Sequence, residues 1–187
     1  MEGNITNSEM QIEFATLGNG CFWCTEAIFQ QLKGVNKVSS GYSGGHTINP
    51  DYKSVCEGKT GHAECLHIEF NPKEISYEEL LEVFWKTHDP TTLNRQGGDI
   101  GTQYRSIIFY HNKAQQEIAE KYKEQLMTSE TYSNPIVTLI EPFTIFYPAE
   151  NYHQGYYLLN DSAPYCHMVV RPKVEKFKNL FQEKLKK

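Results

Sequence analysis

Apolar and polar residues alternate along residues 11–18, QIEFATLG, and this pattern predicts a β-strand. A helix is predicted over 21–32, because Ile28 and Leu32 lie one turn apart and Gly34 is a stop signal. Further strands are predicted over 35–42, 63–70, 104–111 and 136–141. Further helices are predicted over 77–87, after Asn112, over 150–159 and over 172–187.

Two of these helices have local start signals. Ser76 precedes the helix over 77–87, and Glu79 three residues later completes a capping box. Asn112 is placed as the N-cap of the next helix, which has an apolar stripe.

Strands and helices interleave, so we expect an α+β or α/β fold with helices packed on a mixed sheet. The length of 187 residues suits one domain, and no repeat or linker divides it. We therefore expect residues 1–187 to form a single catalytic domain, with residues 1–10 flexible and 172–187 forming a C-terminal helix.

Composition narrows the class of protein. The formal net charge of −5 argues against nucleic-acid binding, which needs a basic face. No apolar run is long enough to cross a membrane, and the first residues lack the features of a signal peptide. We expect a cytoplasmic monomer whose five cysteines are thiols rather than a disulfide framework.

Two long loops, 43–62 and 88–103, interrupt the regular pattern. Loops of this length inside a domain are usually functional or disordered, and Tyr, Val and Cys residues argue against disorder in the first. Tyr52, Asp99 and Tyr104 lie in or just after these loops. From the residues alone they are candidates for a site, with turn formation and packing as the alternatives.

Cys21 follows a strand and a glycine turn and stands where a helix begins. The unpaired N–H groups and positive dipole end of a helix favour a thiolate, so we expect a lowered pKa and a nucleophile at Cys21. The alternative is a buried cysteine used as a small apolar side chain. Phe22 and Trp23 either form an apolar wall beside the thiol or pack in the core.

Cys24 completes a C-x-x-C at the same helix start, a spacing that suits dithiol exchange. A thioredoxin-like disulfide oxidoreductase is therefore one hypothesis, although the two bulky aromatics between the cysteines argue against it. A zinc-binding interaction module is another, but Cys56 and Cys65 are spaced too widely to form a second ligand pair.

Glu64 lies in the strand AECLHIEF, where alternation places it on the same face as Leu66 and Ile68. A carboxyl group on an apolar face is either a misread register or a desolvated acid. Desolvation raises a carboxyl pKa, so Glu64 is a candidate general acid.

The order of several segments resembles one family. GCFWCTEAIF, GYSGG, NPDYKSVCEGKTGHAE, FWKTHDPTTLNRQGGDIGTQYRSIIF and AENYHQGYY resemble the peptide-methionine (S)-S-oxide reductases, the A-type methionine sulfoxide reductases. The resemblance covers residues from about 12 to 170, and GCFW with downstream TGHAE and GTQYRS is a specific combination.

The resemblance implies a role for each matching residue. Cys21 would be the nucleophile and Glu64 the acid that protonates the sulfoxide oxygen. Phe22 and Trp23 would hold the methyl group of the substrate.

The loop residues receive roles in the same way. Tyr52 and Tyr104 would donate hydrogen bonds to the sulfoxide oxygen, and Asp99 would help to orient the site.

The resemblance also implies a two-layer, ferredoxin-like core with a largely antiparallel sheet. It implies reduction of free and protein-bound methionine-S-sulfoxide through a cysteine sulfenic acid, in repair after oxidative stress. Cys21 would be recycled by a dithiol such as thioredoxin, with no metal, flavin or nicotinamide cofactor.

Two departures from the family pattern concern the turn and the second thiol. Asn19 interrupts a turn that is usually rich in glycine, although asparagine tolerates left-handed backbone. Cys166 matches a resolving position, but HMVVRPKVEKF replaces the Gly-rich tail that normally follows. Cys24 is the alternative resolving cysteine, and a disulfide to it within a helix would be geometrically constrained, which favours Cys166.

Overall fold

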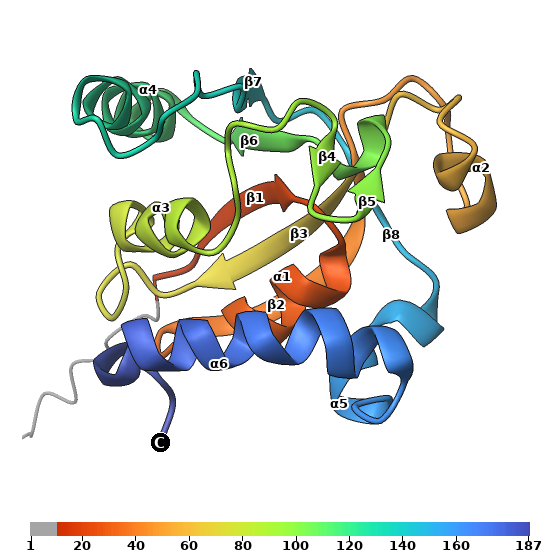
Figure 1. Ribbon diagram of the computed structural model, residues 1–187. Helices are drawn as coiled ribbons and strands as arrows, with labels where there is room; N and C mark the ends of the chain where they lie inside the picture. Colours follow the sequence, from red (N-terminus) through yellow and green to blue (C-terminus); the bar gives the residue numbers. More distant parts are fainter. Residues whose placement is uncertain (1–10) are drawn as a thin grey trace, which may run out of the picture.

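The computed structural model describes residues 11–187, and its central element is a six-stranded sheet (Figure 1). The strand order is β7-β6-β1-β3-β2-β8, and only the pair of β6 and β7 is parallel. The strands are β1 Glu13–Asn19, β2 Val35–Ser43, β3 Ala63–Phe70, β6 Ser106–Tyr110, β7 Leu139–Pro142 and β8 Phe146–Pro148. A separate two-residue hairpin pairs β4 Arg95–Gln96 with β5 Asp99–Ile100.

Some of the helices cover one face of the sheet, and others lie near the site described below. They are α1 Phe22–Phe29, α2 Tyr52–Cys56, α3 Tyr77–Lys86, α4 Lys113–Thr128, α5 Tyr156–Leu159 and α6 Arg171–Leu180. A π-helical turn, Cys166–Val170, leads into α6, and short 3₁₀ turns span Thr102–Tyr104, Asn151–His153 and Gln182–Lys184. In Figure 1, α1, α3 and α6 cover the same face of the sheet.

The central part of this arrangement has the chain order β1-α1-β2-β3-α3-β6 and the sheet order β6-β1-β3-β2. This is the split βαβ topology of ferredoxin-like folds. The predicted fold class, a largely antiparallel sheet with packed helices, is therefore confirmed.

Alternation along the strands separates two apolar clusters. Leu66, Ile68 and Phe70 of β3 pack with the helices, whereas Ala63 and Cys65 face a smaller cluster on the other side. Phe143 and Phe146 cover that smaller cluster, so a chain segment replaces a helix layer there. The sheet is thus buried on both faces near the beginning of β3, which is where Glu64 lies.

Several predicted elements have different bounds in the structure. The predicted C-terminal helix over 172–187 ends at Leu180, and Leu185 instead forms a bridge with Leu32. The predicted helix over 150–159 is divided into a 3₁₀ turn and α5, because Gly155 adopts a left-handed φ of 64°. The loop over 43–62 contains α2, and β8 was not predicted. The expectation for residues 1–10 lies outside the described residues.

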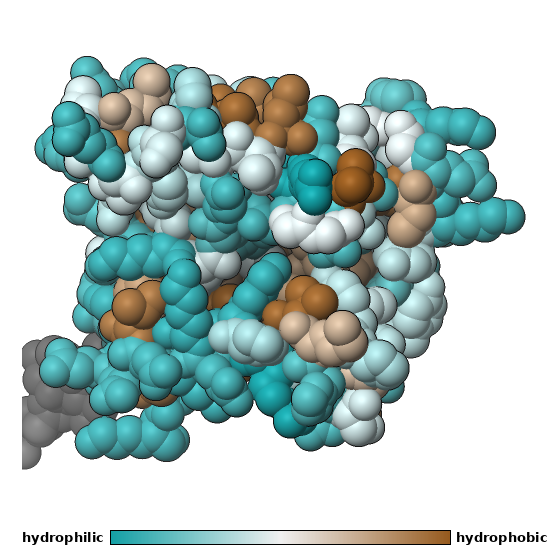
Figure 2. Space-filling model, in the orientation of Figure 1, coloured by the Kyte–Doolittle hydropathy of each residue, from teal (hydrophilic) through white to brown (hydrophobic). Residues whose placement is uncertain are grey.

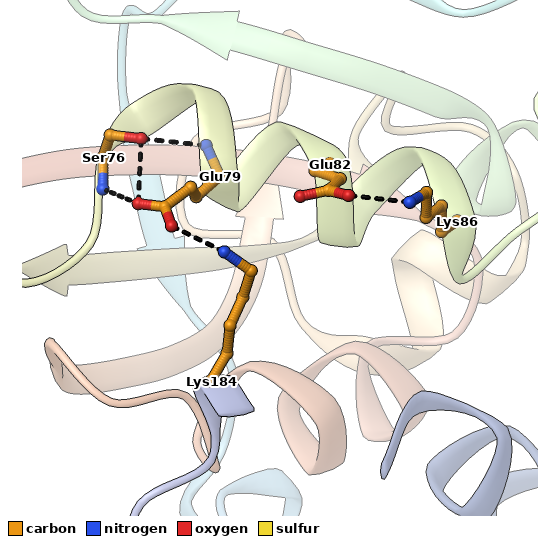
Figure 3. A network of polar contacts seen from close by, with 5 residues as sticks. All are labelled: Ser76, Glu79, Glu82, Lys86 and Lys184. Atoms are coloured by element: carbon orange, nitrogen blue, oxygen red, sulfur yellow. Dashed lines mark hydrogen bonds and ion pairs between the residues drawn. The ribbon is translucent and has the colours of Figure 1, made fainter. Parts of the chain in front are cut away.

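The capping box at the start of α3 is present as predicted (Figure 3). Ser76 Oγ accepts a hydrogen bond from the Glu79 amide, and the Glu79 carboxylate accepts one from the Ser76 amide. Lys184 also binds Glu79, so the last turn of the chain is fastened to α3 (Figure 3).

Figure 2 shows that the face bearing α3 and α6 is mostly hydrophilic, with apolar residues in separate small patches. No helix among residues 11–187 is long and apolar enough to span a bilayer. This face therefore offers no single broad apolar surface on which to base a function, and the chemistry must be sought at the end of the sheet.

Candidate active site

The strand order brings one set of chain segments to the same end of the sheet. Asn19 at the end of β1 pairs with Ser106 at the beginning of β6, and Ser43 at the end of β2 pairs with Ala63 at the beginning of β3. Both long loops and the first turn of α1 therefore meet here. The topology explains why candidates so far apart in the sequence form one site.

Cys21 is the N-cap residue of α1, with extended backbone angles φ −60° and ψ 124°. Gly20 makes the preceding turn with φ 103°, and a Cβ there would lie 2.8 Å from Gln96 carbon atoms. Glycine is therefore required twice over, for the left-handed backbone and for space. This turn presents Cys21 at the point where β1 passes into α1.

Asn19 does not take the left-handed conformation that its place in the turn suggested. It is the last residue of β1, it is buried, and its side-chain oxygen accepts a hydrogen bond from the Thr25 hydroxyl. The side chain thus fastens the end of the strand to the first turn of α1, and Gly20 alone makes the turn.

Glu64 is 1% exposed and lies beneath the start of α1. Its Oε2 accepts a hydrogen bond of 3.0 Å from the Phe22 amide, one of the amides with no partner inside the helix. Burial raises the pKa of Glu64 to about 8, and the Phe22 amide offsets this only in part. Glu64 is therefore protonated at neutral pH, as a proton donor must be.

Cys21 does not have the lowered pKa that its helix position predicted. The residue is 7% exposed, and burial together with the nearby Glu64 and Cys24 raises the pKa of the Cys21 thiol. At the helix start the Phe22 amide binds Glu64 rather than the sulfur, so it does not offset the effect of burial. The nearby Tyr165 hydroxyl opposes the shift, but burial prevails.

Phe22 and Trp23 form part of an aromatic wall next to Cys21. Phe22 is fully buried against Tyr42, so it belongs to the core as well as to the wall. Trp23 is partly exposed, lies parallel to Tyr156 at 3.8 Å between ring centroids, and donates its indole N–H to His153 at 3.1 Å. The wall is therefore held in place from both sides.

Tyr52, Tyr104 and Glu64 lie close together. The negative charge that Glu64 acquires on ionisation contributes to the raised pKa of both tyrosines, and burial is the larger cause. Both phenols therefore stay protonated and can donate hydrogen bonds. Asp99 Oδ2 accepts a hydrogen bond of 2.6 Å from Tyr165, the residue that contacts Cys21. The structure thus brings all the predicted site residues to one end of the sheet.

All five cysteines lie in the described part of the chain, and each is a free thiol. Cys24 faces Cys21, and Cys166 is fully buried near Cys24. Cys65 packs on the other face of the sheet, and Cys56 is exposed on α2. Cys21 has extended backbone, so a disulfide between Cys21 and Cys24 would connect the N-cap residue to a helical residue and would not connect two helical residues. The constraint that disfavoured Cys24 therefore does not apply.

The sequence model of the family described as peptide methionine sulfoxide reductase matches residues 13–185. The chain belongs to this family. The enzyme MsrA 1 of Rhodopirellula baltica is 59% identical over 174 residues, which are 93% of this chain and 90% of that relative. The resemblance seen in the motifs is thereby confirmed.

Solved structures from this family have the same fold. The reduced form of Mxr1 from Saccharomyces cerevisiae is 36% identical, with a TM-score of 0.75 over 89% of this chain and 95% of that one. A second Mxr1 structure, in complex with Trx2, is 29% identical, with a TM-score of 0.53 over 83% of this chain and 92% of that one.

Sequence reasoning did not single out Tyr165, His153 or Lys173, which all contact site residues in this family member. Tyr165 adjoins Cys166, and His153 lies in the segment AENYHQGYY, so both were close to residues already noticed. Lys173 had no such signal, because a lysine in an amphipathic helix reads as a solvated residue. Among residues 11–187, no group of three or more His, Cys, Asp or Glu side chains is arranged to hold a metal ion.

Proposed function

We propose that this protein reduces methionine-S-sulfoxide, free and within proteins, and so repairs oxidised methionine. The observation that supports this best is the pairing of Cys21 with a buried carboxylic acid at one helix start, where the pKa of Glu64 is raised to about 8. A sulfoxide needs both partners, because its sulfur accepts a nucleophile more readily as its oxygen accepts a proton.

The first step transfers one oxygen atom. The Cys21 sulfur attacks the sulfoxide sulfur while Glu64 donates its proton to the oxygen, and Tyr52 and Tyr104 donate hydrogen bonds to the same oxygen. The hydroxyl group then moves from the substrate sulfur to the Cys21 sulfur as the bond between the two sulfurs breaks. The products are methionine and the Cys21 sulfenic acid, so the substrate sulfur gains the two electrons that Cys21 loses. Glu64 regains a proton equivalent to the one that the Cys21 thiol gives up.

The aromatic wall and Asp99 have supporting roles in this proposal. Phe22 and Trp23 hold the methyl group of the substrate against apolar ring faces. Asp99 acts through Tyr165, whose hydroxyl it binds and which in turn contacts Cys21. These contacts orient the sulfoxide so that its sulfur faces Cys21 and its oxygen faces Glu64.

Recycling takes place by thiol chemistry, without a resident metal, flavin or nicotinamide. A second thiol condenses with the sulfenic acid to a disulfide and water, and an external dithiol such as thioredoxin reduces the disulfide. The complex of Mxr1 with Trx2 supports this choice of partner. A reducing cytoplasm would supply thioredoxin and suits a chain with five free thiols, and we propose that one chain is the active unit.

The contact between Cys21 and Cys24 at a helix start favours a second candidate, a disulfide oxidoreductase of the thioredoxin kind. The two candidates differ in substrate. Reduction of insulin disulfides without any conversion of sulfoxide would favour the second candidate.

The deciding experiment is a single turnover without reductant. The enzyme is mixed with an excess of N-acetylmethionine sulfoxide, as separate S and R epimers, and the methionine product is measured by chromatography. We expect about one equivalent of product per chain from the S epimer alone, because Cys21 can accept one oxygen before it needs reduction. No product from either epimer would refute the proposed function, and continued turnover on adding thioredoxin would support the partner.

A further inference from the structure

Lys173 of α6 approaches the second cysteine of the C-x-x-C. Its ammonium nitrogen lies 3.8 Å from Cys24 Sγ, and the two residues come from different helices, α6 and α1. Cys24 is 5% exposed and Lys173 is partly buried. In such surroundings the attraction between an ammonium and a thiolate is only weakly screened.

The two thiols are also close to each other. Cys24 is the third residue of α1, and its amide donates a hydrogen bond of 3.1 Å to the Cys21 carbonyl, so the cap folds back over the first turn. Burial is the main cause of the raised pKa of Cys21, and the nearby Cys24 side chain adds to it, whereas the Cys21 side chain lowers the pKa of Cys24. Cys21 is thus the proton donor of the pair, and Cys24 is the thiol that ionises first.

Other groups that face Cys24 act in both directions. Besides Cys21 and Lys173, the nearby Tyr165 hydroxyl favours the Cys24 thiolate, whereas burial and the negative charge of Asp99 disfavour it. Cys166 is the first residue of the π-helical turn, and burial and the nearby Cys24 raise its pKa. The sum is a lowered pKa for Cys24.

We propose that Lys173 holds Cys24 as a thiolate facing Cys21, and that Cys24 is therefore the thiol that resolves the Cys21 sulfenic acid. Lys173 is a positioning residue in this scheme, since it acts through Cys24. The inference rests on the proposed function, which supplies the sulfenic acid. It reverses the preference for Cys166 drawn from the sequence, because Lys173 contacts Cys24, whereas the buried Cys166 has no such contact with a cation among the described residues.

The step balances without an outside oxidant. The lone pair of the Cys24 thiolate forms the S–S bond to Cys21, the S–O bond of the sulfenic acid breaks, and the departing hydroxide takes up a proton and leaves as water. The oxidising equivalents came from the sulfoxide. The resulting disulfide joins the N-cap of α1 to the third residue of the helix.

The test has two readouts on the full chain. The first is a map of the disulfide in wild-type enzyme after one turnover, by mass spectrometry of non-reduced peptides. We expect a link between Cys21 and Cys24. A link between Cys21 and Cys166 as the main product would overturn the proposal.

The second readout is the rate of disulfide formation after the methionine burst, followed by loss of free thiols from pH 6 to 10. The variants are Lys173→Met, Lys173→Arg and, as matched control, Lys176→Met at an exposed position of the same helix. If the pKa of Cys24 rises by one unit, about nine-tenths of its thiolate is lost at a pH below that pKa. A more basic thiolate is also a better nucleophile, and this recovers about half of the loss in rate on a logarithmic scale. We therefore expect Lys173→Met to be about three- to tenfold slower at pH 7 and close to wild type at pH 10.

The controls separate an electrostatic role from a structural one. Lys173→Arg retains the charge and should keep most of the rate, and Lys176→Met should match wild type. Equal slowing of Lys173→Met at every pH, or no slowing at pH 7, would overturn the proposal. If no methionine burst occurs in wild type, the proposed function fails separately. Hydrogen peroxide is then used to oxidise Cys21, and the same comparison of variants decides the role of Lys173.

Discussion

The helices α1 and α3 begin at opposite ends of the sheet layer and in opposite ways. At α3, Ser76 and Glu79 satisfy each other's backbone groups at the surface, and Lys184 binds the same carboxylate (Figure 3). At α1, the side chain of the N-cap residue, Cys21, makes no capping hydrogen bond, and the Phe22 amide binds the buried Glu64 instead. Both starts pair a helix amide with a glutamate, yet the environments differ.

The difference lies in solvent. Hydrogen bonds from Lys184 and Ser76 lower the pKa of the partly exposed Glu79, whereas burial raises the pKa of Glu64 to about 8. The first carboxyl is a fixed anion that stabilises a helix, and the second is an acid with a proton to donate. One type of contact thus serves stability at α3 and chemistry at α1, and burial decides which.

The largest expected effect is at the cap of α1. Replacing Cys21 with serine should lower single-turnover sulfoxide reduction by at least about 10³-fold, because the nucleophile is lost. The fold should persist, since serine is a favoured N-cap residue. The measurement is methionine release per chain. The matched variant Cys65→Ala, on the other face of the sheet, should retain the burst, and a full burst from Cys21→Ser would refute its role.

Glu64→Gln tests the acid. We expect a loss of about 10² to 10⁴-fold at pH 6 to 7, the usual contribution of a general acid. The advantage of the wild type over Glu64→Gln depends on protonated Glu64, so it should shrink as pH rises through about 8, and the two rates should converge above that. The rate of Glu64→Gln itself should show no change linked to a pKa of about 8.

A second buried glutamate provides the control for this variant. Glu26 is also buried and has a raised pKa, but its carboxylate binds the Gly155 amide away from Cys21. Glu26→Gln should keep the pH dependence of the wild type. If Glu64→Gln also kept it, another group would have to supply the proton.

Ser76→Ala should have the reverse profile. Loss of the capping hydrogen bond should reduce the free energy of unfolding by about 1 kcal/mol, within the 0.5–2 kcal/mol typical of N-caps. Sulfoxide reduction should not change, because α3 begins far from the sheet end that holds Cys21. Urea unfolding measures the first effect, with Ser162→Ala at an exposed position as control. Reduced activity at unchanged stability would contradict the contrast between the two helix starts.

The smallest expected effect concerns Lys184. Its ion pair with Glu79 is partly exposed, with side-chain exposures of 28% and 42%. Lys184→Met should lower the free energy of unfolding by roughly 0.2–1 kcal/mol, and most of the difference should vanish at high salt, where such pairs are screened. A larger, salt-independent loss would show that Lys184 acts by packing and not by charge.

Much of the fold could be predicted from local patterns. The strand predicted over 63–70 is β3, Ala63–Phe70, and the helix predicted over 77–87 is α3, Tyr77–Lys86, because alternation and a capping box are local signals. The end of the C-terminal helix and β8 were missed. After the helix ends at Leu180, Leu185 pairs with Leu32, and β8 exists through its pairing with β2, so both depend on distant partners.

The sequence by itself determined the family and the layered fold, and it marked Cys21 and Glu64 as the candidate nucleophile and acid. Its alternating pattern placed Glu64 on the face of Leu66 and Ile68 but left open whether the acid is desolvated or the register is misread. Tertiary structure decided the protonation states, because the Phe22 amide that could have stabilised a Cys21 thiolate binds Glu64 instead. It also decided that Lys173, far along the chain, reaches Cys24. Charges and desolvation depend on neighbours in space, and these neighbours are distant in sequence.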